Sequence, residues 1–267
     1  MSNNTFDINT VTLSRSWFYV DDALESQINA LRKRCGAFDD SGSYPVLWST
    51  RSKFVLLLTL DDGTKLVYKA PRKMRSAIRY IFRPGPWGQE AVNFSLLEKV
   101  GLPLVKMVSA GETRNFFMLK SGFLMTEYAE GFSDGRLFTY KGELKDEKHL
   151  IDEFVRRNFQ YLAKMHRAGF IHNGFTPPNL LFKIRTSPDA DGNLLDLRWI
   201  DVASCEKVKF KIGSKTRMAR DLSLFFRFFR FTDEEKLSFL ATYCESNPDI
   251  GMTPEKLLEV IRKNPVR

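Results

Sequence analysis

Polar residues of catalytic types flank a predicted hairpin in the second half of the chain. A predicted helix over 151–168 leads into a loop that carries His172 and Asn179, and an apolar strand over 180–184 follows. The next apolar strand, 195–200, is followed at once by Asp201. Proteins use imidazole, amide and carboxylate groups to move protons and to hold cations. A carboxylate here can also simply end a strand, so spacing alone leaves both interpretations open.

Segment 162–181 resembles the catalytic loop of protein kinases, whose pattern is L-H-x-x-G-I-x-H-R-D-L-x-x-x-N-[IL]-L. The residues that fall on positions of this pattern are His166, Gly169, His172 and Asn179. A match that runs across a predicted helix, a loop and a strand is specific. The resemblance covers about residues 44–229.

The resemblance implies a nucleotide site with ATP and Mg²⁺ as cofactors. In the family, the amide oxygen at the position of Asn179 binds Mg²⁺ that bridges the phosphates. Asp201 stands at the position of the D-F-G aspartate, which is the second metal ligand. We therefore expect Asn179 and Asp201 to hold the metal together.

Lys69, in the predicted strand 65–69, resembles the family's lysine that binds the α- and β-phosphates. Its expected partner is Glu90 on a predicted helix over 88–100, and Glu98 on the same helix is the alternative. An ion pair would keep Lys69 extended toward phosphate. Without such a partner, Lys69 is only an exposed lysine on a strand.

The segment 49–53 joins the first two predicted strands, where the family carries a glycine-rich loop, and it contains no glycine. Hydroxyl groups, backbone amides and Arg51 remain to hold phosphate, less closely. Glu127, which ends the predicted strand 116–127, is the other expected nucleotide contact.

Gly174 departs most from the family, because it occupies the position of the aspartate that accepts the proton of the substrate hydroxyl. Glycine can neither accept that proton nor orient the hydroxyl. Loss of a general base costs about 10²- to 10⁴-fold in rate. His172 is a candidate substitute, although its position in the family is more often structural. Phosphoryl transfer relies on positioning and electrostatics, so some transfer is compatible with the loss.

Within this superfamily the chain resembles the lipopolysaccharide-core kinases, the Kdo and heptose kinase group. The resemblance rests on the small size, on segments 90–103, 200–203 and 217–222, and on the lack of a long activation segment with an A-P-E motif. It implies phosphate transfer to a core sugar hydroxyl. The alternative is a pseudokinase that regulates or scaffolds envelope and lipopolysaccharide biogenesis with a protein partner.

The chain has two basic stretches. The first is suited to an anionic membrane face or to phosphorylated sugars, although apolar residues packed on the lobe with merely solvated cations explain it equally well, and the second is suited to an acidic acceptor. The first combines cations with apolar residues at helical spacing: Arg72, Lys73, Met74, Arg75, Ile78, Arg79, Ile81, Phe82 and Arg83. The second follows Asp201 and consists of Lys207, Lys209, Lys211, Lys215 and Arg217.

The elements that must position these residues change in type along the chain. The residues up to about 37 form a partly helical leader, strands dominate as far as 127, and helices dominate afterwards. We therefore predict an α+β, bilobal, protein-kinase-like fold. Residues 1–127 form the leader and a β-rich N-lobe, and residues 128–267 form a mainly helical C-lobe with the catalytic-type loop.

Composition narrows the protein class. The chain of 267 residues carries 41 Lys and Arg against 32 Asp and Glu, which favours anionic partners. It has no recognition motif for nucleic acid, so we expect no specific nucleic-acid binding. Three scattered cysteines favour a reducing compartment. With no apolar leader segment, the expected location is the cytoplasm, with peripheral contact at the inner face of the inner membrane as an option.

Overall fold

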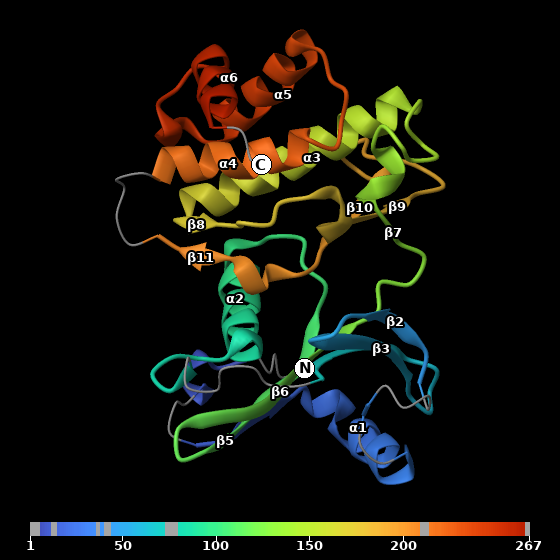
Figure 1. The fold of residues 1–267 in the computed structure, drawn as a ribbon. Helices are drawn as coiled ribbons and strands as arrows, with labels where there is room; N and C mark the ends of the chain where they lie inside the picture. The colour runs from blue at the N-terminus through green and yellow to red at the C-terminus, as the bar shows by residue number, and fades with distance from the viewer. Residues whose placement is uncertain are drawn as a thin grey trace. The chain divides into compact units, whose positions relative to one another are not determined.

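A computed structural model describes residues 6–11, 15–35, 38–39, 44–72, 80–208 and 214–264 (Figure 1). The chain divides into two compact units. The first comprises Met1–Leu96 and Val105–Glu130, and the second comprises Leu97–Leu104 and Gly131–Arg267.

The first unit is built on a six-stranded antiparallel sheet with the order β1-β5-β6-β4-β3-β2. Its strands are β1 (Trp17–Val20), β2 (Val46–Ser49), β3 (Lys53–Thr59), β4 (Lys65–Pro71), β5 (Met107–Asn115) and β6 (Met118–Glu127). The strands β3 and β4 form a hairpin. Gly63 has a positive φ of 85°, and the Asp62 carboxylate accepts a hydrogen bond from the Thr64 amide at 2.8 Å.

One face of this sheet packs against helix α1 (Asp22–Cys35). Alternate residues of β3, Phe54, Leu56 and Leu58, are buried in the same apolar cluster as Ile28 and Leu31 of α1. Alternation of buried side chains is what a strand with one covered face requires. The leader is thus helical where its sequence predicts a helix.

Two sequence-based expectations in this unit are wrong in detail. The leader also contributes β1, an edge strand that pairs with β5, and four residues are too few to show an alternating pattern. The strand predicted from Phe116 begins at Met118, because Phe116 and Phe117 form the turn between β5 and β6.

Helix α2 (Pro86–Val100) begins with a proline, whose missing N–H is not needed at that position. It ends at Gly101, which has a φ of 76°. Residues of α2 up to Leu96 belong to the first unit, and the end of the helix belongs to the second. Glu90 and Phe94 are buried on α2.

The second unit is mainly helical. Helix α3 packs against α5, and α6 packs against both α4 and α5. The helices are α3 (Lys148–Arg167), α4 (Ser214–Phe226), α5 (Asp233–Ser246) and α6 (Pro254–Lys263). Phe225, Phe226 and Phe229 are buried in this unit. Among the described residues, we find no helix with the length and apolar character needed to span a membrane.

Short strands and 3₁₀ turns complete the second unit. One small sheet has the order β10-β9-β7, and β8 pairs with β11. The strands are β7 (Ser133–Asp134), β8 (Phe170–Ile171), β9 (Leu180–Ile184), β10 (Leu195–Trp199) and β11 (Glu206–Lys207). The 3₁₀ turns of the chain are η1 (Ile8–Thr10), η3 (Gly135–Phe138), η4 (Pro177–Asn179), η5 (Val202–Ser204) and η6 (Pro248–Ile250).

Candidate functional site

The loop between β8 and β9 brings Gly174, Asn179 and Asp201 together in the second unit. The side-chain amide of Asn179 donates to the carbonyl oxygen of Gly174 at 2.9 Å. The backbone amide of Ile200 donates to the carbonyl oxygen of Asn179 at 3.0 Å, which places Asp201 beside Asn179. Because the amide nitrogen of Asn179 is used by the chain, its amide oxygen is the atom suited to a cation.

Asp201 has a φ of 57°, in the left-handed region that Asp and Asn adopt more readily than most residues. Asn173 has a φ of 59° on the other side of Gly174. Backbone of this kind costs free energy and persists only where the surroundings enforce it. Here a hydrogen bond from the Asn173 side chain to the carbonyl oxygen of Ser204, at 3.0 Å, ties the loop to η5. Amide and carboxylate oxygens, which Asn179 and Asp201 supply, are ligands that Mg²⁺ prefers.

The loop is anchored by Asp221, a fully buried carboxylate on α4. Its oxygens accept from the backbone amides of His172 and Asn173 at 2.8 and 2.9 Å. They also lie 3.1 Å from Nε2 of His166. The same carboxylate accepts from the backbone amide of His172, so at this contact Nε2 of His166 is the donor.

The same network continues to α5. Nδ1 of His166 lies 2.6 Å from the hydroxyl of Tyr243, and Asn247 donates to that hydroxyl at 3.0 Å. Burial raises the pKa of Tyr243, so its hydroxyl keeps the proton that it donates. Each polar group in this chain of contacts has a partner, and such satisfied buried networks fix one arrangement of the loop.

His172 is fully buried, between the rings of Phe175 and Trp199. Burial lowers its pKa below the ordinary value of 6.5. The negative charges of Asp221 and Asp201 act to raise the pKa, but their effect is smaller than that of burial. Neither ring nitrogen has a hydrogen-bond partner within the described part of the chain. A neutral imidazole away from solvent fits a packing role better than that of a base for an incoming hydroxyl.

Gly174 leaves a space bordered by polar groups. A Cβ added at this position would lie 3.1 Å from Oγ of Ser204, 3.7 Å from Nδ1 of His172 and 3.9 Å from Nδ2 of Asn179. Only the contact with Ser204 is tight, and that side chain can shift. A carboxylate at position 174 would therefore lie close to Asn179, the predicted metal ligand, and would require little rearrangement of the loop.

In the first unit, Lys69 of β4 and Glu90 of α2 form a bidentate ion pair. The lysine nitrogen lies 3.0 and 2.9 Å from the two carboxylate oxygens. Glu90 is almost completely buried and the side chain of Lys69 is only 17% exposed. Glu98, the alternative partner, is exposed on the same helix. A lysine held in this way is positioned rather than merely solvated.

The other predicted contacts have less support. Arg51 is exposed in the turn between β2 and β3, which the Thr50 hydroxyl closes by accepting from the amides of Ser52 and Lys53. The exposed Glu127 carboxylate lies 3.9 Å from the ammonium group of Lys106. Each unit thus holds one part of the predicted site: Lys69 and Glu90 in the first, and Asn179 and Asp201 in the second.

Both basic stretches are described only in part. Residues 73–79 of the first and 209–213 of the second lie outside the described residues. In the second stretch, Arg217 forms an ion pair with Glu206 at 2.7 Å, and Lys207 lies over the ring of Phe170. The charge that Arg217 offers to an anionic acceptor is therefore reduced.

Residues 71–243 match the model of the lipopolysaccharide kinase (Kdo/WaaP) family, over more than half of the chain. The chain belongs to the Kdo/WaaP family. The match includes the catalytic-type loop, Asp201 and Asp221, and it begins two residues after Lys69. The resemblance to lipopolysaccharide kinases is thereby confirmed, whereas the role of Lys69 rests on its ion pair with Glu90.

Solved structures support the fold. WaaP in complex with acyl carrier protein is similar over 92% of this chain and 96% of that chain, with a TM-score of 0.65 and 18% identity. At this identity the likeness shows the fold, and it confirms the predicted bilobal kinase-like α+β architecture.

Weaker likenesses involve an ATP-soaked Stt7 homologue from Micromonas algae and a Rio2 kinase–ADP/Mg²⁺–phosphoaspartate complex from Chaetomium thermophilum. The first is 16% identical over 61% of this chain and 49% of that chain, with a TM-score of 0.42. The second is 13% identical over 89% of this chain and 74% of that chain, with a TM-score of 0.45. TM-scores below 0.5 carry no argument. Among curated proteins, no match was found.

Sequence reasoning did not assign a role to Asp221 or to Ser204. Asp221 lies in the 217–222 segment that contributes to the family resemblance, and a carboxylate among apolar positions of α4 was the available signal. Ser204 gave no signal, because its importance depends on its closeness to Gly174 in three dimensions.

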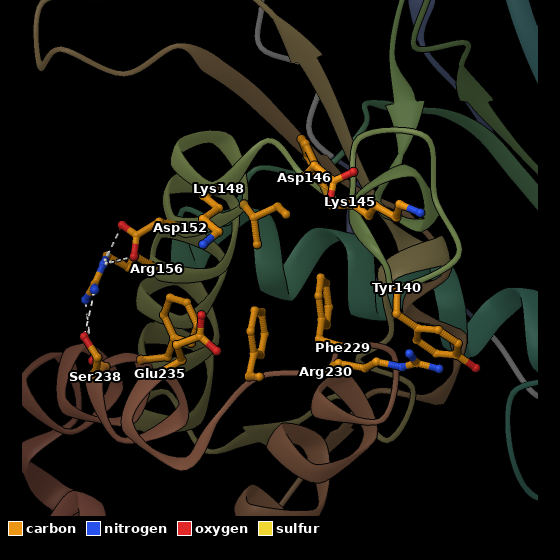
Figure 2. A pocket seen from close by; sticks show the side chains of 14 residues that line it. Tyr140, Lys145, Asp146, Lys148, Asp152, Arg156, Phe229, Arg230, Glu235 and Ser238 are labelled. Atoms are coloured by element: carbon orange, nitrogen blue, oxygen red, sulfur yellow. Dashed lines mark hydrogen bonds and ion pairs between the residues drawn. The ribbon is translucent and has the colours of Figure 1, made fainter.

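A cavity of about 570 Å³ lies in the second unit, apart from the Kdo/WaaP family's loop residues (Figure 2). Aromatic rings form its wall and charged side chains its rim; Figure 2 shows Arg156 held by Asp152 and Ser238. None of the predicted site residues lines it. It is therefore a separate hollow and not the predicted metal site.

The Asp221 network predicts a large loss of stability on Asp221→Ala. The change leaves two buried backbone amides and the His166 ring without their acceptor, so the free energy of unfolding should fall by about 3–5 kcal/mol. Urea unfolding measures this. Glu259→Ala, which removes an exposed pair with Lys263, is the control and should change stability by less than about 1 kcal/mol. Equal effects of the two changes would contradict the anchoring role.

The lowered pKa of His172 predicts a loss of stability in mild acid. Below its ordinary pKa of 6.5, the unfolded chain takes up a proton at His172 that the folded chain refuses. The free energy of unfolding should therefore fall by about 1 kcal/mol between pH 7.5 and 5.5, and His172→Phe should remove this part of the slope. Phe175→Leu, which alters a neighbouring ring, should lower stability but keep the slope. An unchanged slope in His172→Phe would refute the assignment.

Proposed function

We propose that the chain binds ATP and Mg²⁺ and transfers the γ-phosphate to a sugar hydroxyl of the lipopolysaccharide core. Membership of the Kdo/WaaP family supports the substrate class. The observation that carries the proposal is the bidentate ion pair of Lys69 with Glu90, because a buried carboxylate that fixes a lysine is how kinases prepare a cation for phosphate.

The proposed roles follow from the chemistry of each side chain. Lys69 binds and orients the phosphates as a positive charge. Asn179 and Asp201 supply the oxygens that would hold Mg²⁺, which when bound neutralises charge on the phosphates. The acceptor oxygen forms a bond to the γ-phosphorus, the bond to the β–γ bridging oxygen breaks, and ADP leaves. The proton of the acceptor hydroxyl goes late to water or to another group, since Gly174 offers no base.

Gly174 favours a second candidate function, that of a pseudokinase. Such a protein would respond to nucleotide, or serve as a scaffold, and regulate an enzyme or assembly of envelope biogenesis. The two functions share the nucleotide site and differ in whether phosphate is transferred.

The proposal also names partners and a location. The acceptor is the lipopolysaccharide core saccharide or another anionic acceptor, reached in the cytoplasm at the inner face of the inner membrane. WaaP has been solved in complex with acyl carrier protein, which supports proposing a protein partner for this chain as well.

Nucleotide binding tests the site directly. Wild type should bind ATP more tightly with Mg²⁺ than without it, and Asp201→Asn should weaken the Mg²⁺-dependent binding by about ten-fold or more. Lys69→Met should weaken binding with or without the metal. Lys65→Met is the matched control, because Lys65 lies on the same strand but pairs with the exposed Glu130. Titration calorimetry measures each affinity. Absence of ATP binding by wild type would leave only the scaffold function.

A carboxylate placed at position 174 distinguishes the kinase from the pseudokinase. In Gly174→Asp, combined with Ser204→Ala to relieve the close contact, transfer to core oligosaccharide should rise by about 10²- to 10⁴-fold. Gly174→Ala with Ser204→Ala is the control, because it adds the Cβ without the base, and it should show no rise. Phosphate transfer is followed with labelled ATP. Measurable transfer by wild type supports the kinase, and a gain only in the Asp variant supports the pseudokinase. No gain would contradict the view that only the base is missing.

A further inference from the structure

The turn between β5 and β6 exposes two aromatic side chains in an unusual backbone. Phe116 and Phe117 have φ values of 45° and 66°, where turns of this kind favour Asn and Gly. They are 87% and 47% exposed. Neither turn formation nor core packing accounts for two phenylalanines here. Figure 1 shows the green β5–β6 hairpin with its turn at one end of the unit's sheet, apart from α1.

A third exposed ring is held beside this turn. The buried guanidinium group of Arg114 donates to the carbonyl oxygens of Phe117 and Tyr80 through one nitrogen, at 3.0 and 2.9 Å. Its other nitrogen donates to the carbonyl oxygen of Arg83 at 3.2 Å. Phe82 lies between Tyr80 and Arg83 and is 89% exposed. Arg114 thus fixes Phe82, Phe116 and Phe117 in one region of the first unit.

The side chain of Arg114 is itself held in place. Arg114 also pairs with Glu112 at 2.8 Å, and both side chains are completely buried. Glu112 in turn accepts from the backbone amide of Gly88, at the start of α2, at 2.9 Å. The aromatic tip, defined as Phe82, Phe116 and Phe117, is therefore presented by a fixed support rather than by a loose loop.

The charged residues that flank the aromatic tip in the sequence are basic. Exposed Arg83 adjoins Phe82, and exposed Lys120 follows the turn on β6. No Asp or Glu occurs at positions 72–89 or 113–126. Glu112, the acidic residue nearest in sequence to the turn, is already neutralised by Arg114. Exposed aromatic rings with flanking cations are the pattern by which proteins insert into the headgroup region of anionic bilayers.

We propose that the aromatic tip inserts into the surface of an anionic lipid bilayer, with Arg83 and Lys120 facing the headgroup phosphates. The inference shares a membrane location with the proposed function but does not depend on nucleotide or on phosphate transfer. Vesicle binding without ATP can therefore fail while kinase activity is present, and the reverse can also occur.

The test uses the full chain and vesicles of phosphatidylcholine with or without phosphatidylglycerol. Phe116→Asn with Phe117→Gly removes two rings and supplies the residues that the turn prefers, so the fold should be kept or stabilised. Co-sedimentation with anionic vesicles should fall by about ten-fold or more in this variant. Binding of wild type should be weaker on neutral vesicles and should decrease with salt.

Ile184→Asn is the matched control, since Ile184 is 46% exposed on β9 of the second unit, and its binding should equal that of wild type. Phe82→Ser is a second variant in the tip and should also weaken binding. Equal vesicle binding by wild type and the Asn-Gly variant would overturn the proposal. So would a wild type that ignores vesicles, or a tip that instead mediates self-association, seen as a dimer lost in the variant on gel filtration.

Discussion

The catalytic-type loop depends on one buried carboxylate. Asp221 accepts from the backbone amides of His172 and Asn173, so it fixes the chain immediately before Gly174. Through His166 and Tyr243 it also connects α3, α4 and α5. The positions of Asn179 and Asp201 follow from this anchor, from the pairing of β9 with β10 and from the backbone bond between Ile200 and Asn179. Burial of the Asp221 carboxylate costs free energy, and its hydrogen bonds offset this cost at the point where they make the loop rigid.

This anchoring explains how the loop keeps its form with glycine at position 174. The backbone near Gly174 is held from α4 and η5, so its geometry does not require a side chain at position 174. Gly174 itself supplies no base, and polar groups border the space that a side chain at this position would occupy. His172 does not fill that role, because it is buried and its pKa is lowered. Glycine at position 174 therefore leaves the architecture of the loop intact.

Local signals in the sequence were sufficient for most of the fold. The strands β4 and β9 and the helix α2 follow from turn residues, apolar runs and helix boundaries, all of which act over a few residues. The strand β1 was missed because four residues carry no period, and its pairing with β5 is made about 90 residues away in the chain. Similarly, the choice of Glu90 over Glu98 depends on which side of α2 faces Lys69, and the contact of Ser204 with Gly174 depends on tertiary packing.

The proposed lack of a base at Gly174 and the proposed insertion of the aromatic tip into a membrane have connected consequences. A base contributes about 10²- to 10⁴-fold, whereas fixing two reactants in reach of each other contributes as much or more. A core saccharide carried on lipid is confined to the bilayer surface, and a protein bound to the same surface meets it at a raised effective concentration. A low rate of phosphate transfer per encounter would then be offset by more frequent encounters. Under the kinase proposal, insertion of Phe116 and Phe117 would compensate in part for Gly174. Under the pseudokinase proposal, it would hold a nucleotide-binding scaffold where the lipid-linked saccharide is processed.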